Sequence, residues 1–212
     1  MSQSLQSPES TVRHGAKRAD YDRERVLELI DELLICHIGQ QAEGRVVVTP
    51  TCHWRDGDYL YWHAHAKARS CAGTAGSPVC VNLCSLDGLV LARSAFHHSV
   101  NYRSVTLFGV PEAVENEVEK AHQLQLLVER LSRGRWQQLR PMRAAELKAT
   151  AVVRLRIDNA SAKVRQGPPL DDASDLDWPV WAGEMALVKQ WQPRADSMGQ
   201  SEPVMALAAE RL

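Results

Sequence analysis

Residues 86–105 read LDGLVLARSAFHHSVNYRSV and combine apolar, β-branched segments with a polar centre. The pair Asp87-Gly88 is a strong hairpin signal, because aspartate and glycine accept the backbone angles of a tight turn. Together with the residues on either side, this region predicts strands over residues 79–86, 89–96 and 101–114. Consecutive strands joined by a tight turn pair with each other, so the region indicates an antiparallel sheet.

The sequence on both sides adds more strands of similar length. The turn pairs Glu43-Gly44 and Asp56-Gly57 separate strand-like segments upstream, and a β-branched segment and one last plausible strand follow downstream. The additional strands are expected at residues 36–40, 45–54, 59–65, 150–157 and 180–188. So many short strands, interrupted by only two good helices, favour an antiparallel, Greek-key-like barrel of six or more strands over alternating α/β units. We therefore expect a mainly β fold covered by helices.

Two amphipathic helices are expected to provide that cover. Residues 20–34 place apolar side chains at helical spacing after Asp20, the expected N-cap. Residues 115–131 repeat the pattern, with Asn116 and Glu119 as the cap. Shorter helical segments are expected at residues 66–75 and 142–148.

The same patterns divide the chain into three parts. Residues 1–18 are polar and aperiodic, which predicts a flexible N-terminal arm, or one ordered only by a partner subunit. Residues 19–192 form the single expected domain. Residues 193–212 are expected to be an irregular C-terminal tail.

Composition excludes several classes of partner. The 212 residues carry 25 Lys and Arg against 26 Asp and Glu, so the net charge favours neither nucleic acid nor a membrane surface. The polar N-terminus lacks the apolar segment of a secretory signal, and no apolar run is long enough to span a bilayer. We expect a cytoplasmic protein whose five cysteines are free, buried thiols, because their spacing lacks the gaps of a zinc site.

One cationic segment follows the expected strand 59–65. Lys67, Arg69 and Ser70 lie at the entry to the expected helix 66–75, where free backbone amides and the helix dipole favour an anion. This arrangement suits a phosphate, although ordinary surface cations at a solvated helix start would give the same pattern. His63 and His65 share a strand face, but no carboxylate stands at a matching offset, so we expect no metal site.

A second polar segment runs from residue 93 to residue 104. Arg103 suits a phosphate or a ring carbonyl, and Asn101 and Ser104 suit the edge of a ring. His97 or His98 suits a proton donor facing a substrate, because imidazole titrates near neutral pH. A polar hairpin loop with solvated histidines is the alternative interpretation. Further along the chain, Trp178 and Trp181 offer flat surfaces for a ring system, or bury area against the barrel.

Several of these segments together resemble one known family. They are Tyr61-Trp62-His63-Ala64-His65, residues 86–99, Asn101-Tyr102-Arg103-Ser104-Val105, Gly134-Arg135-Trp136, residues 146–150, residues 161–165, Gly167-Pro168-Pro169 and Trp181-Ala182-Gly183. Over residues 18–188 the chain resembles the FMN-binding branch of the pyridoxamine-phosphate oxidase-like superfamily that includes the nitroimidazole-resistance flavoproteins. The resemblance implies a split β-barrel that forms a homodimer with two equivalent FMN sites at the subunit interface.

The resemblance also implies roles for individual residues. The phosphate would fall to Lys67, Arg69 and Ser70, close to His63. The ring would be edged by Thr49, Pro50 and Thr51, completed by Asn101, Arg103 and Ser104, and approached by Trp181 of the partner subunit. Two departures from the family pattern matter: Ala68 stands where relatives often have a serine, and residues 191–198 lack the arginine and histidine pattern that holds the vitamin substrate. We therefore do not expect pyridoxamine-phosphate oxidase activity itself.

The expected function is thus that of an FMN-dependent oxidoreductase, which takes electrons from a reduced nicotinamide and passes them to a small, flat or nitroaromatic acceptor. His97 and His98 are the candidate proton donors. A flavin carrier or sensor without turnover is one alternative. A split barrel that holds haem in the dimer cleft, with a histidine as axial ligand, is another.

Overall fold

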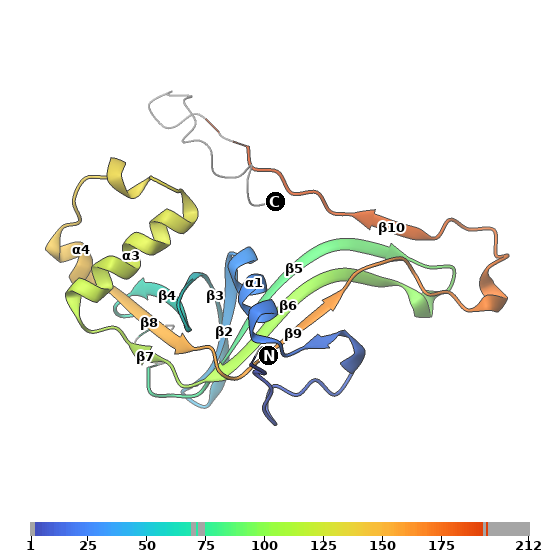
Figure 1. Ribbon diagram of the computed structural model, residues 1–212, viewed down its shortest axis with the longest axis horizontal. Helices are drawn as coiled ribbons and strands as arrows, with labels where there is room; N and C mark the ends of the chain where they lie inside the picture. The colour runs from blue at the N-terminus through green and yellow to red at the C-terminus, as the bar shows by residue number, and fades with distance from the viewer. Residues whose placement is uncertain (1–2, 69–70, 72–74, 193, 195–212) are drawn as a thin grey trace.

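The computed structural model describes residues 3–68, 71, 75–192 and 194, and within them the chain forms one antiparallel sheet of ten strands (Figure 1). The strands β1 to β10 span Ala19–Asp20, Ile35–Ala42, Arg45–Asp56, Tyr59–His65, Val79–Leu91, Ser99–Gly109, Glu112–Ala113, Thr150–Arg156, Ala160–Arg165 and Gly183–Ala186. The helices are α1 (Arg23–Glu32), α3 (Glu117–Leu131) and α4 (Ala144–Ala149). The expected mainly β fold with few helices is confirmed.

The order of the strands is β1-β9-β6-β5-β2-β3-β4-β8-β7, and β10 pairs with β5 outside this path. Strand β3 pairs with β2 along its first part and with β4 along its last part, so it joins the two halves of the sheet. Strand β5 pairs with β2 near its start, with β10 near its end and with β6 along most of its length. The sheet therefore curls around a core at one end and continues as a long hairpin at the other.

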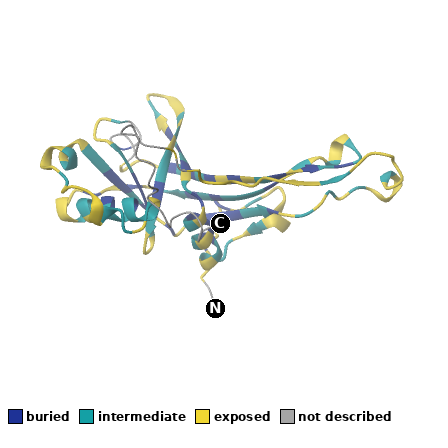
Figure 2. Cartoon of the chain, turned by 90° about the horizontal axis from the view of Figure 1, so that it is seen from above, coloured by how far each residue is buried: buried dark blue, intermediate teal, exposed yellow. Residues whose placement is uncertain are grey.

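We call this end of the molecule the extension. It comprises residues 86–101 of the hairpin and residues 166–191, which contain β10. Figure 1 shows it reaching away from the helices, with β10 and the chain after β9 beside β5 and β6. Figure 2 shows that buried residues concentrate at the other end of the molecule and exposed residues dominate the tip of the extension. The extension thus offers surface rather than core.

The hydrophobic core has two parts. The larger cluster lies under α1, which supplies Val26, Leu29 and Ile30, all without exposed surface. The smaller cluster lies under α3, where Trp54 and Tyr61 stack with ring centroids 5.8 Å apart. The two helices cover different parts of the sheet, as amphipathic helices on a barrel are expected to do.

Helix α1 begins two residues later than expected. The side chain of Asp22, not Asp20, accepts a hydrogen bond from the backbone N–H of Arg25 and forms the N-cap. Asp20 instead lies in β1, which pairs with β9. At the other end of α1, the guanidinium of Arg130 donates to the carbonyl oxygens of Ile30, Asp31 and Leu33. Helix α3, with Asn116 as its N-cap, agrees with the prediction.

The N-terminal segment is not the free arm that its composition predicts. Leu5 is 1% exposed and belongs to the larger core cluster. Its backbone bonds to Tyr21 and Ala160, and Ser4 forms a bridge with Asp22. One buried leucine, a few backbone bonds and side-chain hydrogen bonds such as that from Ser7 to Asn159 hold this segment without any periodic pattern, which explains why its sequence does not reveal it.

The expected turn at Asp87-Gly88 is wrong. Strand β5 runs through it, and the ladder with β6 shifts register between Leu86 and Gly88. Gly88 does not have the positive φ of a tight turn. A Cβ on Gly88 would lie 2.7 Å from the carbonyl oxygen of Met185, so this glycine admits the close approach of β10. The hairpin connection is instead at residues 92–98.

Most of the remaining expected elements are present with shifted ends, but the expected strand at residues 101–114 is divided into β6 and β7. Strand β9 is missing from the expected set, although it pairs with both β1 and β6. Half of the expected helix at residues 66–75 lies outside the described residues, as does the expected tail after residue 194.

Candidate functional site

The loop after β4 holds the first group of predicted residues. Register pairs His65 with Thr150, and the backbone N–H of Ala66 donates to the carbonyl oxygen of Ala149 at 2.8 Å, so the loop starts beside the junction of α4 and β8. Lys67 is exposed, and its backbone N–H donates to Nδ1 of His65. Arg69 and Ser70, the other predicted phosphate ligands, lie outside the described residues.

His63 lies deeper on the same strand. Its ring is 6.1 Å from that of Trp54, in the part of the sheet covered by α3. Nδ1 is buried and has no hydrogen-bond partner among the described residues. Burial lowers the pKa of His63 below its usual value, because the charged ring would lose solvation. The structure thus separates His63 from the exposed Lys67.

On β3, the three predicted residues do not share a face. Side chains alternate along a strand, so Pro50 lies on one face and Thr49 and Thr51 on the other. The face of Pro50 is exposed and apolar, with Val46 at 82% and Val48 at 60% exposure. The hydroxyl of Thr51 approaches the carbonyl oxygen of His63 at 3.5 Å, which places it against β4.

Arg103 is bound by two carboxylates. Its Nε and Nη2 donate to the two oxygens of Asp87 at 2.9 Å each, and Nη1 donates to Glu32 at the end of α1. The hydrogen bond from Arg103 is the main reason that the pKa of Asp87 lies below its usual value. The predicted anion-binding guanidinium thus joins the extension to α1 within this chain.

The predicted site residues next to Arg103 are also hydrogen-bonded within the chain. Ser104 points to the opposite face of β6 and donates to the carbonyl oxygen of Lys163 at 3.1 Å. Asn101 is buried, donates to Glu184 on β10 at 2.6 Å and accepts from Arg165. The three residues expected to complete one site therefore serve three separate contacts.

His97 and His98 lie at the tip of the extension, beside Phe96, which is 88% exposed. Nε2 of His97 is 3.3 Å from the carboxylate of Asp172. Nδ1 of His98 is 2.8 Å from the carbonyl oxygen of Ser94. His98 is exposed, so its Nε2 is presented to whatever approaches the tip.

The tip is fixed from the other side by the segment after β9. Asp171 accepts hydrogen bonds from the backbone N–H and the guanidinium of Arg93, both at 2.8 Å. Trp181, the residue expected to approach from a partner subunit, is 61% exposed in one chain. A Cβ on Gly183 would lie 2.7 Å from its ring, so this glycine makes room for the indole.

One chain does not bring all the predicted residues together. Figure 1 places the connection 92–98 and the loop after β4 at opposite ends of the molecule. Sequence patterns did not single out Glu115, Lys120 and Lys148, which line a cavity beside that loop. All three lie in or next to expected helices, and although Lys148 falls within the family-like segment 146–150, the sequence assigned it no role.

Two further classes of site are absent from the described residues. No three His, Cys, Asp or Glu side chains gather there as a metal centre would require. None of the helices in that part of the chain combines the length and apolar character needed to cross a membrane.

The curled antiparallel sheet, the helices on it and the loop at the end of β4 define a split β-barrel protein. A family model described as pyridoxamine 5'-phosphate oxidase matches residues 22–164, and the chain belongs to that family of flavin-binding split barrels. No curated protein sequence matches the chain.

Three solved structures show how far the similarity extends. The flavocytochrome Anf3 from Azotobacter vinelandii is 40% identical, with 94% of each chain covered and a TM-score of 0.88. The FAD and haem binding protein from Mycobacterium smegmatis is 31% identical, covering 88% of this chain and 95% of its own, with a TM-score of 0.78. A candidate 5-nitroimidazole antibiotic resistance protein from Bacteroides thetaiotaomicron is 20% identical, covers 69% of this chain and 86% of its own, has a TM-score of 0.54, and is similar in fold alone.

Proposed function

We propose that this protein is an oxidoreductase that binds a flavin nucleotide and a haem, and that two copies of the chain together form each site. The flavin would supply hydride and single-electron transfer, and the haem single-electron transfer. The haem-binding split barrel, an alternative on sequence grounds, thereby joins the flavoprotein interpretation. Pyridoxamine-phosphate oxidation is not part of the proposal.

The main support for the proposal is the share of this chain that the similar solved structures cover. The family model ends at residue 164, but the flavocytochrome covers 94% of this chain and the FAD and haem binding protein 88%. Those shares exceed residues 1–164, so each includes part of the segment after β9. The similarity to two proteins named for flavin and haem therefore continues beyond the residues that the family model matches.

The side chains of the extension fit a haem. A histidine that ligates a metal usually donates its other ring N–H to a carbonyl or carboxylate, which fixes the tautomer. His98 has this arrangement, with Nδ1 against the carbonyl oxygen of Ser94 and an exposed Nε2. Its surroundings, with Phe96 at 88% and Val100 at 38% exposure, suit the apolar faces of a porphyrin. His98 is thus the candidate axial ligand.

The exposed surfaces support a dimer. Val46 and Val48 on β3 and Ile35 on β2 lie exposed at 82%, 60% and 43%. Apolar area of this kind on a sheet face is typical of a protein interface. A second copy related by two-fold symmetry would also allow the tip of one chain to approach the β4 loop of the other, which one chain keeps apart.

Within this proposal the electron donor is a reduced nicotinamide and the acceptor is a small, flat molecule. Lys67, exposed at the start of the loop after β4, is the described residue that would face the flavin phosphate. His97 is the remaining candidate proton donor at the tip. NADPH oxidation with a panel of acceptors, a nitroimidazole and dioxygen among them, distinguishes an enzyme from a carrier that binds without turnover.

The absorbance spectrum of freshly purified protein tests the cofactors. We expect the two visible bands of a flavin together with the Soret band of haem. Where the protein is isolated without them, added FAD or FMN and added haemin should bind to a folded species with twice the mass of one chain in light scattering. Folded protein that takes up no flavin from excess would contradict the proposal.

A further inference from the structure

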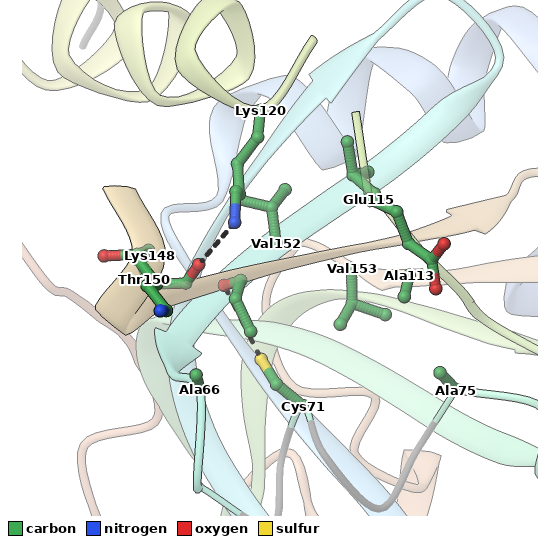
Figure 3. Close-up of a pocket in the computed structure, with 12 residues that line it drawn as sticks. Ala66, Cys71, Ala75, Ala113, Glu115, Lys120, Lys148, Thr150, Val152 and Val153 are labelled. Carbon is green, nitrogen blue, oxygen red and sulfur yellow. Dashed lines mark hydrogen bonds between the residues drawn. The ribbon is translucent and has the colours of Figure 1, made fainter. Parts of the chain in front are cut away.

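A cavity of about 380 Å³ lies beside the loop after β4. It is bordered by Ala66 and Cys71 from that loop, by residues 113–115, by Lys120 of α3, by Lys148 of α4 and by residues 150–153 of β8 (Figure 3). Its volume is within the range of roughly 300–1,000 Å³ that small-molecule sites occupy. Ala66 borders the cavity and begins the loop predicted to bind the flavin phosphate, so the cavity lies next to the start of that loop.

One end of the cavity is cationic. Lys120 reaches in from α3, and its ammonium donates one hydrogen bond to the carbonyl oxygen of Thr150 at 3.1 Å, which leaves two N–H groups available. Lys148 is exposed at the same end and has no hydrogen bond or ion pair within the part of the chain that the structure describes. Two ammonium groups at the same end of a cavity favour a phosphate or diphosphate.

The rest of the lining suits the remainder of a nucleotide. Ala66, Ala75 and Ala113 are exposed and give the cavity apolar walls against which a base can lie. Glu115 lines the cavity away from Lys148, and Figure 3 shows the two at opposite ends. A carboxylate in that position is a hydrogen-bond acceptor for ribose hydroxyls, as in many dinucleotide sites, and it would repel a phosphate placed there. The lining therefore gives a bound nucleotide one orientation.

We propose that this cavity holds the adenylate half of FAD, with the diphosphate at Lys120 and Lys148 and the ribose towards Glu115. The proposal rests on the proposed flavin function and names its nucleotide. FMN has no group to fill the cavity, so these residues make the protein specific for the dinucleotide.

Calorimetric titration of flavin-free protein with FAD and with FMN tests the proposal. We expect FAD to bind about tenfold or more tightly, the equivalent of one well-formed charged contact or more. Lys148→Gln should lower the affinity for FAD by about three- to tenfold and change that for FMN by less than about twofold. Lys148 is exposed, so the variant should fold normally.

A second variant fills the cavity without removing charge. Ala113 is exposed on β7, so Ala113→Phe should be tolerated by the fold while its ring takes the place of the base. It should weaken FAD binding selectively as well. Lys17→Gln, which removes an exposed cation outside the cavity lining, is the matched control and should change neither affinity.

The outcomes separate this inference from the function on which it rests. Equal affinities of the unchanged protein for FAD and FMN, or equal losses for both in Lys148→Gln and Ala113→Phe, would overturn the cavity assignment and leave flavin binding intact. Failure of both flavins to bind would overturn the flavin function and the assignment together.

Discussion

Arg93 and Asp171 hold the two halves of the extension together. Asp171 accepts from both the backbone N–H and the guanidinium of Arg93 at 2.8 Å, and its side chain is only 3% exposed. Residue 93 precedes the tip and residue 171 follows β9, so this pair joins segments that are 78 residues apart in sequence.

This pair predicts how the extension responds to acid. The backbone N–H of Arg93, followed by its guanidinium, holds the pKa of Asp171 below its usual 3.8. A carboxyl whose pKa is lower in the folded than in the unfolded state stabilises the folded protein at pH values above its usual pKa. This stabilisation is lost as the pH falls through the lower pKa of the folded state. Tryptophan fluorescence from Trp178 and Trp181 should therefore be constant down to about pH 4 and change below it, whereas Asp171→Asn should show the changed signal at neutral pH.

The two adjacent histidines predict opposite results for haem. His98→Ala should shift and broaden the Soret band and weaken haem binding, because Nε2 of His98 is the proposed ligand. His97→Ala should keep the band, since the ring of His97 is directed to Asp172 at 3.3 Å. Spectra of both variants loaded with haemin measure this directly, and the reverse pattern would reassign the ligand to His97.

Gly88→Ala predicts a local effect. The new Cβ would meet the carbonyl oxygen of Met185 at 2.7 Å, so β10 would have to leave β5. We expect residues 183–191 to become sensitive to protease while the main unfolding transition of the barrel moves little, because the core under α1 lies elsewhere. Loss of the whole fold would show that β10 is part of the cooperative unit. Leu89→Ala, a substitution on the same strand at a side chain that is 43% exposed, is the control.

His53 predicts a loss of stability in mild acid. It is 1% exposed, and burial lowers its pKa to about 4. The ring therefore stays neutral in the folded protein at a pH where it is already charged in the unfolded chain. The folded state loses stability as the pH falls from 6.5 to about 4, by about 3 kcal/mol in total. Urea unfolding at several pH values should show this slope, and it should be absent in His53→Phe and retained in His14→Ala.

Arg103 predicts a structural rather than a ligand-binding effect. Its guanidinium forms ion pairs with Asp87 and Glu32, and its side chain is 34% exposed. Arg103→Met should lower the free energy of unfolding by about 1 kcal/mol, a value already reduced for solvent screening. Flavin affinity should change less than about twofold. A large loss of flavin binding with unchanged stability would instead support the role that the family resemblance implies.

The sequence predicted most of the barrel because its strands follow local rules. Alternation and turn pairs located β2, β3 and β4 closely, and capping located the start of α3 at Asn116. The failures have non-local causes. Gly88 has the sequence of a turn but serves the approach of β10, which comes from about a hundred residues later in the chain. Leu5 is held by contacts to Tyr21 and Ala160 that no local pattern encodes.

The contacts of the candidate site residues were harder to predict from the sequence, for a related reason. Residue type indicated that Arg103 and Asn101 would need partners, but a single sequence does not say which partners they find. In the structure these are Glu32, Asp87, Arg165 and Glu184, from four different elements or connections. Lys148 lies in the family-like segment 146–150, but its sequence gives it no partner, and only the fold brings it to the same cavity as Lys120 and the loop after β4.

The register shift in β5 separates two ladders within one strand. Before Leu86 the strand pairs with β2 and β6, and from Gly88 onward it pairs with β10 and, in a register shifted by one residue, still with β6. An extra residue is already accommodated at that point, so a change in length beyond it does not alter the pairing behind it. Family members can therefore lengthen, shorten or lose the extension while inheriting an unchanged barrel, and new cofactor chemistry can evolve at one end of the molecule without refolding the other.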